Sequence, residues 1–183
     1  MFYNIDLSKI FNHKFMYNDD PKDDIEVGLD NTYVLKNELI FNNYTFFNNV
    51  SFLFSDTDYD NVICDNQQIY INQKVDKLHL IAFSYWGSTN AFLKVIFEDD
   101  SIELIKIPFI DWVQKAKVNY ETISWYGEGI STIKQIETHG SLKTTVNFHH
   151  TVTEINTKKL IKEIIFPDNF LLHIFAMTLE KTE

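Results

Sequence analysis

Two short loops combine a large aromatic side chain with polar neighbours, the residue types that recognise sugars. The aromatic and polar members are Trp86 and Asn90 in the first loop and Trp125, Tyr126 and Glu128 in the second. An aromatic ring covers the apolar face of a pyranose, and amide or carboxylate groups hydrogen-bond its hydroxyls. We expect a glycan or small sugar to bind at these loops. The alternative is that Trp86 packs at the edge of the core, as most large aromatic residues do.

Carboxylates are concentrated near the N-terminus, where six acidic residues fall within twelve positions. A structural calcium ion requires several oxygen ligands at close spacing, and four of these residues could provide them: Asp19, Asp23, Asp24 and Asp30. The spacing does not match the twelve-residue EF-hand loop. A solvated acidic loop is the alternative interpretation, and neither interpretation makes a cofactor a requirement of the fold.

Six histidines raise the question of zinc or acid–base chemistry, but their spacing gives no ligand set. His149 and His150 are adjacent, and neighbouring residues of a strand point to opposite faces, so these two cannot bind one ion together. His79 and His173 lie inside apolar segments. We therefore expect these two to be hydrogen-bonded core residues.

Sequence motifs for nucleophilic catalysis or phosphate binding are absent. The glycines at 127 and 129 flank Glu128 rather than a serine, so no Gly-x-Ser-x-Gly elbow is present, and no glycine-rich phosphate loop occurs. A two-carboxylate glycoside hydrolase could use any pair of the 26 acidic residues. The sequence favours no such pair, and we expect a protein without catalytic activity.

Charge and composition restrict the partners. The formal net charge is −10, and all 16 basic residues are lysine. A field of this sign repels nucleic acids and anionic membranes, and arginine, the residue best suited to bind phosphate, is missing. The N-terminus lacks the pattern of a signal peptide, which favours a cytoplasmic location unless export follows another route. Cys64, the only cysteine, is expected to be a small buried residue.

The elements that must position these groups are short β-strands separated by Asp, Asn, Gly and Ser, the pattern of an all-β sandwich. The nearly continuous apolar run from Leu78 to Phe83 predicts a central strand covered on both faces. Asp111 and Trp112 are expected to be structural, and residues 113–142 an irregular insertion or a hairpin with long loops. We expect one domain over residues 1–183, with strands at 50–54, 62–63, 68–71, 78–85, 92–97, 102–107, 144–155, 161–166 and 171–179.

The order of several short segments resembles that of galactose-binding-like jelly-roll β-sandwich modules, which occur in bacteria beside glycosidase domains and alone. The segments are Asp6-Leu7-Ser8, DNVICDNQQI, LHLIA, EDDS, FIDW and IIFPDNFLLHIFAMTLE. The resemblance implies a two-sheet antiparallel sandwich, a structural calcium ion in many relatives, and carbohydrate binding at loops on one end. The chain departs from the pattern around residues 23–38, where it keeps Gly28 and Tyr33 but lacks the other glycines.

Three functions therefore compete. The first is a non-catalytic carbohydrate-binding protein that uses its end loops. The second is an intracellular protein interaction or assembly module that uses a sheet face or edge of the same fold. The third, a glycoside hydrolase, would require activity that falls on the substitution Glu128→Gln.

Overall fold

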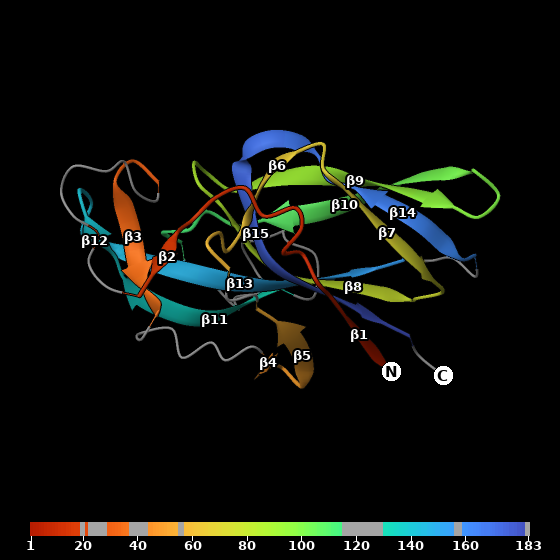
Figure 1. Ribbon diagram of the computed structural model, residues 1–183, viewed down its shortest axis with the longest axis horizontal. Coiled ribbons are helices and arrows are strands. Elements are labelled where there is room, and N and C mark those ends of the chain that lie inside the picture. The colour runs from red at the N-terminus through yellow and green to blue at the C-terminus, as the bar shows by residue number, and fades with distance from the viewer. Residues whose placement is uncertain are drawn as a thin grey trace, which may run out of the picture.

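Two antiparallel sheets face each other and form a β-sandwich (Figure 1). The structure is a computed structural model, and it describes residues 1–18, 21, 29–36, 44–54, 57–114, 130–155 and 159–181. The six-stranded sheet has the order β1-β15-β8-β13-β11, with β6 also paired to β15. Its strands are β1 (Phe2–Ile5), β6 (Val62–Asp65), β8 (Lys77–Ser84), β11 (Ile130–Glu137), β13 (Thr145–Glu154) and β15 (Asp168–Glu180).

The four-stranded sheet has the order β10-β9-β14-β7. Its strands are β7 (Gln68–Gln73), β9 (Thr89–Phe97), β10 (Ile102–Phe109) and β14 (Ile161–Ile165). Two smaller sheets complete the described part of the chain. One is β12-β3-β2, made of β2 (Met16–Tyr17), β3 (Thr32–Leu35) and β12 (His139–Gly140); the other is the hairpin of β4 (Tyr44–Phe47) and β5 (Val50–Leu53).

The six-stranded sheet is covered on both faces, and its side chains therefore enter two cores. Leu78, Leu80 and Ala82 of β8 pack into the core shared with the four-stranded sheet. Ile81 and Phe83 pack into the second core, which the N-terminal segment and the β4–β5 hairpin cover. Because successive strand residues point to opposite faces, a strand buried on both sides is apolar at nearly every position. The central-strand prediction is confirmed.

Most predicted strands are confirmed to within a few residues. For residues 113–142 the expectation is an irregular insertion or a hairpin with long loops. Residues 115–129 lie outside the described residues, and the irregular alternative is wrong for residues 130–137. Residues Ile130–Glu137 form strand β11 at an edge of the six-stranded sheet. A register shift between Thr132 and Lys134 marks a bulge against β13. A bulge changes which side chains face the core. The isoleucines at 130, 133 and 136 are spaced three apart and do not alternate as in a regular strand, yet all three belong to β11.

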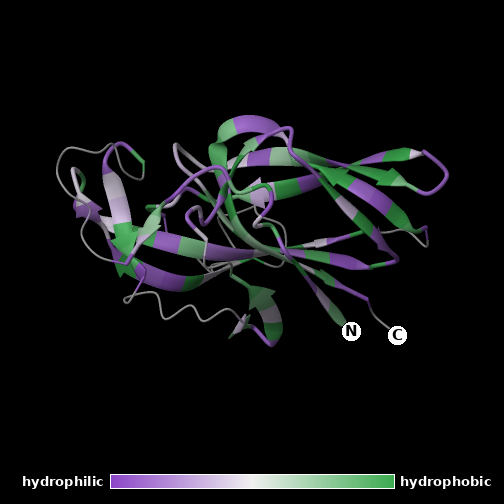
Figure 2. Ribbon diagram, viewed as in Figure 1, coloured by the Kyte–Doolittle hydropathy of each residue, from purple (hydrophilic) through white to green (hydrophobic). Residues whose placement is uncertain are grey.

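The two ends of the described chain lie side by side (Figure 1). Strand β1 pairs with the C-terminal end of β15, and the amino group of Met1 donates to the carbonyl of Lys181 at 2.7 Å. Figure 2 shows how apolar and polar residues alternate along the strands. Among the described residues, no helix is long and apolar enough to span a membrane.

Candidate functional site

A pocket of about 410 Å³ lies where the turn of the β4–β5 hairpin meets the six-stranded sheet. Strands β8, β13 and β15 each provide polar side chains to it, and β1 provides an aromatic ring. The residues that matter for its chemistry are Phe2, Asn48, Lys77, His79, His150 and Glu180. Four elements that are distant in sequence thus bring amide, imidazole, carboxylate and ammonium groups together.

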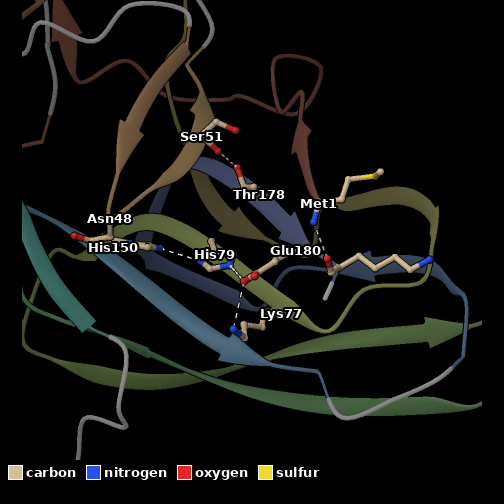
Figure 3. Close-up of polar contacts among 9 residues, drawn as sticks. Met1, Asn48, Ser51, Lys77, His79, His150, Thr178 and Glu180 are labelled. Carbon is tan, nitrogen blue, oxygen red and sulfur yellow. Dashed lines mark hydrogen bonds and ion pairs between the residues drawn. The ribbon is translucent and has the colours of Figure 1, made fainter. Parts of the chain in front are cut away.

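Four of these side chains form a continuous hydrogen-bonded relay (Figure 3). Nδ2 of Asn48 lies 3.1 Å from Nδ1 of His150, and Nε2 of His150 lies 3.1 Å from Nδ1 of His79. Nε2 of His79 lies 3.1 Å from Oε2 of Glu180, and the same oxygen is 3.4 Å from the ammonium of Lys77. The relay therefore runs from an uncharged amide to an ion pair.

Strand register explains why these residues meet. Lys77 and His79 are two apart on β8 and share a face, as do Thr178 and Glu180 on β15. Glu180 lies directly opposite Lys77, so the ion pair is a cross-strand pair. His79 lies opposite Val152 of β13, two residues beyond His150, which places the two imidazoles within diagonal reach.

Asn48 reaches the relay because of the conformation of the hairpin turn. Phe47 and Val50 pair directly, and the two residues between them, Asn48 and Asn49, have φ angles of 50° and 64°. Positive φ at both central positions is the type I′ turn, which fits the twist of a two-residue hairpin and which asparagine tolerates. The turn thus directs the Asn48 amide toward His150.

The partners fix where the protons lie. The Asn48 N–H donates to Nδ1 of His150, so the proton of that ring is on Nε2. The Nε2–H of His150 donates to Nδ1 of His79, and the Nε2–H of His79 donates to the Glu180 carboxylate. Both rings are neutral in this arrangement, and every hydrogen bond has one donor and one acceptor.

Burial keeps the two histidines neutral. It lowers the pKa of His150 to about 4, and repulsion from His79 acts in the same direction. Burial also lowers the pKa of His79, partly opposed by the hydrogen bond and charge of Glu180. Desolvation disfavours a charged imidazole unless an anion contacts it directly. Near neutral pH the relay therefore carries no charge except that of the Lys77–Glu180 pair.

The relay leaves few groups able to contact a ligand. Both ring nitrogens of His79 and both of His150 are engaged inside the protein. Among the described residues, neither the second oxygen of Glu180 nor the other two N–H groups of Lys77 has a partner. The pocket therefore offers one carboxylate acceptor beside ammonium donors.

The predicted Trp86 loop is exposed. Trp86 is 71% exposed in the turn between β8 and β9, so the alternative in which it packs at the edge of the core is wrong. Asn90 is half-buried at the start of β9. The Gly87 N–H donates to Asp111, whose neighbour Trp112 is buried, as expected for a structural pair. The second predicted loop, with Trp125, Tyr126 and Glu128, lies outside the described residues.

The calcium prediction stays a prediction. Asp19, Asp23 and Asp24 lie outside the described residues. Asp30 is described, and its carboxylate accepts a hydrogen bond from the Tyr85 hydroxyl. Within the described ranges, no group of three His, Cys, Asp or Glu residues could hold a metal ion.

The outer face of the four-stranded sheet is a second candidate surface. Phe92 lies directly opposite Lys106, and Leu104 lies opposite Lys94, so lysines alternate with apolar side chains. The face carries four apolar residues that are each more than half exposed: Tyr70 on β7, Phe92 on β9, and Ile102 and Leu104 on β10. An apolar patch of this kind on a folded domain commonly marks an interaction site.

Comparison with known protein families gives one match. A model of the AziU2-like β-sandwich domain matches residues 3–183. The chain belongs to this family. The match agrees with the observed sandwich. A search of curated proteins found no match.

In this AziU2-like domain the expectations for two single histidines are confirmed, whereas the relay was not predicted. His79 and His173 are buried and hydrogen-bonded as expected, His173 through Nδ1 to Asn61 at 2.9 Å. Adjacent asparagines between two apolar strands are a hairpin signal that could have predicted the turn at Asn48. No sequence signal predicted which strand would lie beside His150.

Proposed function

We propose that this protein is a non-catalytic binding module whose pocket takes a small, neutral, hydroxyl-rich ligand, such as one sugar unit of a glycan. The observation that carries the proposal is the Lys77–Glu180 pair at 3.4 Å in the pocket. A hydroxyl can donate to the carboxylate and accept from the ammonium. Glu180 would repel an anion, and Lys77 would repel a cation. The net-neutral pair therefore favours an uncharged ligand.

The apolar part of the pocket also suits a sugar ring. Phe2 is 39% exposed and lies edge-on to His79, with ring centroids 6.1 Å apart. Ile130 and Val152 add aliphatic surface. The volume of about 410 Å³ falls within the range of about 300–1,000 Å³ typical of small-molecule sites.

Binding without catalysis is favoured because the relay consumes the groups that acid–base chemistry would need. A general base must reach a proton of the bound ligand, and both nitrogens of His79 are already engaged. Hydrolysis of a glycoside uses two carboxyl groups across the bond that breaks. In the described part of the chain, Glu180 is the one carboxylate among the pocket residues.

Two finer expectations stay proposals beside this one. Glycan binding could instead use the end loops with Trp86 and Trp125, and the domain could be of the galactose-binding-like carbohydrate-binding type. Exposure of Trp86 supports the first of these. Variants at the pocket and at the loop distinguish the two locations.

The test is an NMR titration of the protein with methyl glycosides of galactose, glucose and mannose and with myo-inositol. We expect saturable shifts of amides near Phe2, Lys77 and Glu180 at concentrations up to about 20 mM, which would saturate a site with a Kd of ~1 mM. Glu180→Gln should weaken binding at least about tenfold because a charged acceptor is lost. Glu163→Gln on the other sheet is the matched control.

The outcomes are distinct. Shifts confined to the Trp86 turn, and abolished by Trp86→Ala but not by Glu180→Gln, would move the site to the end loop. No saturable shift with any of the four ligands would overturn the proposed function.

A second candidate is a protein interaction module, favoured by the exposed apolar face of the four-stranded sheet. Aliphatic Ile102 and Leu104 contribute to that face beside aromatic Phe92, and aliphatic side chains suit a protein partner better than the flat face of a sugar. Lys94 and Lys106 on an otherwise acidic molecule favour a partner surface with carboxylates among apolar groups.

Size-exclusion chromatography with light scattering tests this candidate, using Leu104→Glu and, as a matched control, Phe170→Glu at an exposed position of β15. Co-elution with a partner that Leu104→Glu abolishes and Phe170→Glu preserves would support it. A wild-type protein that stays monomeric and retains nothing beyond what Leu104→Glu retains would contradict it.

A further inference from the structure

The β4–β5 hairpin is attached to the six-stranded sheet through side chains. It forms a separate two-stranded sheet in which Phe47 pairs with Val50 across the turn. A two-stranded hairpin is at best marginally stable by itself. Its position over the pocket therefore depends on its contacts with the larger sheet.

Contacts with the larger sheet hold the hairpin at several points. Phe52 is fully buried and lies edge-on to the His150 ring, with centroids 5.2 Å apart. The Thr178 hydroxyl donates to the carbonyl of Ser51 at 2.6 Å. At the turn, the Asn48 amide donates to Nδ1 of His150 at 3.1 Å (Figure 3). In the turn contact, the acceptor is an imidazole nitrogen that can itself gain a proton.

Adding one proton to the two histidines reverses the relay. The stable place for the charge is His79, because its Nε2–H faces the Glu180 carboxylate. His79 then carries a second proton on Nδ1, which points at Nε2 of His150. That nitrogen must become the acceptor, so the neutral His150 ring now holds its proton on Nδ1. Two donors, this N–H and the Asn48 N–H, then face each other.

We propose that the β4–β5 hairpin is a proton-controlled latch on the pocket: uptake of one proton by the His79–His150 pair breaks the hydrogen bond from the Asn48 N–H to His150 and loosens the turn. Asn48 and Asn49 of the turn line the pocket together with Val50 of β5, so loosening the turn loosens one wall of the pocket. The inference concerns the regulation of the pocket to which the proposed function assigns a ligand. The latch itself needs no ligand, so it can be tested and can fail separately.

The groups around the pair set the direction of this response. Glu180 of β15 faces His79 and favours its charge, whereas Lys77 of β8 opposes it. An aromatic ring contacts each imidazole: Phe2 of β1 lies beside His79, and Phe52 of β5 lies beside His150. Burial therefore holds the pair neutral near pH 7, and proton uptake belongs to mildly acidic conditions.

Three substitutions in the turn separate a latch from a merely structural contact. Asn48→Gly removes the amide and keeps a residue that accepts positive φ. Asn48→Asp replaces the amide by an acceptor that suits the protonated relay, so it should hold the turn in acid and raise the pH at which the pair titrates. Asn49→Gly is the matched control, because it changes the adjacent turn position and leaves Asn48 in place.

The experiment is hydrogen–deuterium exchange of the ligand-free protein at pH 7 and pH 5, as protection factors, with NMR titration of the imidazoles. In the wild type and Asn49→Gly, the protection factors of the slowly exchanging β4 and β5 amides should fall about fivefold from pH 7 to pH 5, relative to the protection factors of the β8 amides. Loss of one ordinary hydrogen bond predicts a change of this size. Asn48→Gly should show the low value at both pH values. Asn48→Asp should keep its protection at pH 5.

Two results would overturn the latch. One is wild-type hairpin protection that changes with pH no more than that of β8. The other is an Asn48→Asp variant whose hairpin loosens in acid as the wild type does, because a structural contact alone predicts no difference in pH response.

Discussion

The carboxylate of Asp60 accepts a hydrogen bond from the backbone N–H of Met16 at 2.8 Å, although the two residues are 44 positions apart. The same carboxylate accepts from the backbone N–H of Phe15 at 3.0 Å and from Asn61 Nδ2 at 2.8 Å. Asp60 is 2% exposed. One buried side chain thus fixes the N-terminal segment that covers the second core.

Asp60→Ala should lower the free energy of unfolding by about 2–4 kcal/mol, because it leaves two buried backbone donors without an acceptor. Urea denaturation followed by circular dichroism measures the loss. Asp65→Ala, at an exposed position of β6, is the control and should change stability by less than about 0.5 kcal/mol. Equal effects of the two substitutions would contradict this role for Asp60.

Stability should fall as the pH drops from 7 toward 4. Burial lowers the pKa of His149 and His150 to about 4, and it also lowers the pKa of His79 and His173. As the pH falls, these imidazoles gain protons at a higher pH in the unfolded chain than in the folded protein. The stability that each contributes is present above pH 6.5 and is lost as the pH falls toward its folded pKa, by about 3 kcal/mol for His149 or His150.

Asp60 acts in the opposite direction. Burial raises its pKa to about 6, so the folded state holds this proton more tightly than the unfolded chain. Its contribution of about 3 kcal/mol is present below pH 3.8 and is lost as the pH rises through 6. Asp60→Asn removes this offset. Thermal unfolding at pH 7, 6, 5 and 4 should therefore show a steeper acid decline in the variant than in the wild type.

The two described tryptophans, Trp86 after β8 and Trp112 after β10, should respond very differently to truncation. Trp112 is 4% exposed, and its ring lies 5.0 Å from that of Tyr85 and 6.1 Å from that of Phe83. Trp112→Ala should cost about 3–5 kcal/mol of stability. Trp86→Ala, at a 71% exposed position, should cost about 0.5 kcal/mol or less. Denaturant titrations compare them, and a large loss at Trp86 would contradict its placement.

Two glycines with positive φ offer a matched pair. A Cβ at Gly140 would lie 1.9 Å from the carbonyl oxygen of Asn31, whereas a Cβ at Gly87 meets no atom within 4 Å. In both alanine variants the left-handed backbone conformation should lower the free energy of unfolding by about 1 kcal/mol. Only Gly140→Ala must also push β12 away from the segment before β3. We expect it to unfold at a lower temperature than Gly87→Ala, and the reverse order would contradict the register of β12 and β3.

The sequence predicted elements well where a local pattern is complete. The apolar run at Leu78–Phe83 identified a central strand because side-chain burial and strand propensity act over a few positions. Strand β11 was missed because its bulge against β13 breaks the alternation. A bulge depends on the partner strand, which no short window contains.

The sequence by itself determined that this protein is an acidic all-β sandwich with buried, hydrogen-bonded histidines, since composition, alternation and burial preference are properties of local segments. Only the tertiary structure decided that Asn48, His150, His79 and Glu180 form one relay. Those four residues lie on four elements, and the distances between them depend on strand order and register. The pairing of strands follows from the packing of both cores together, so the site emerges only when the whole sandwich is assembled.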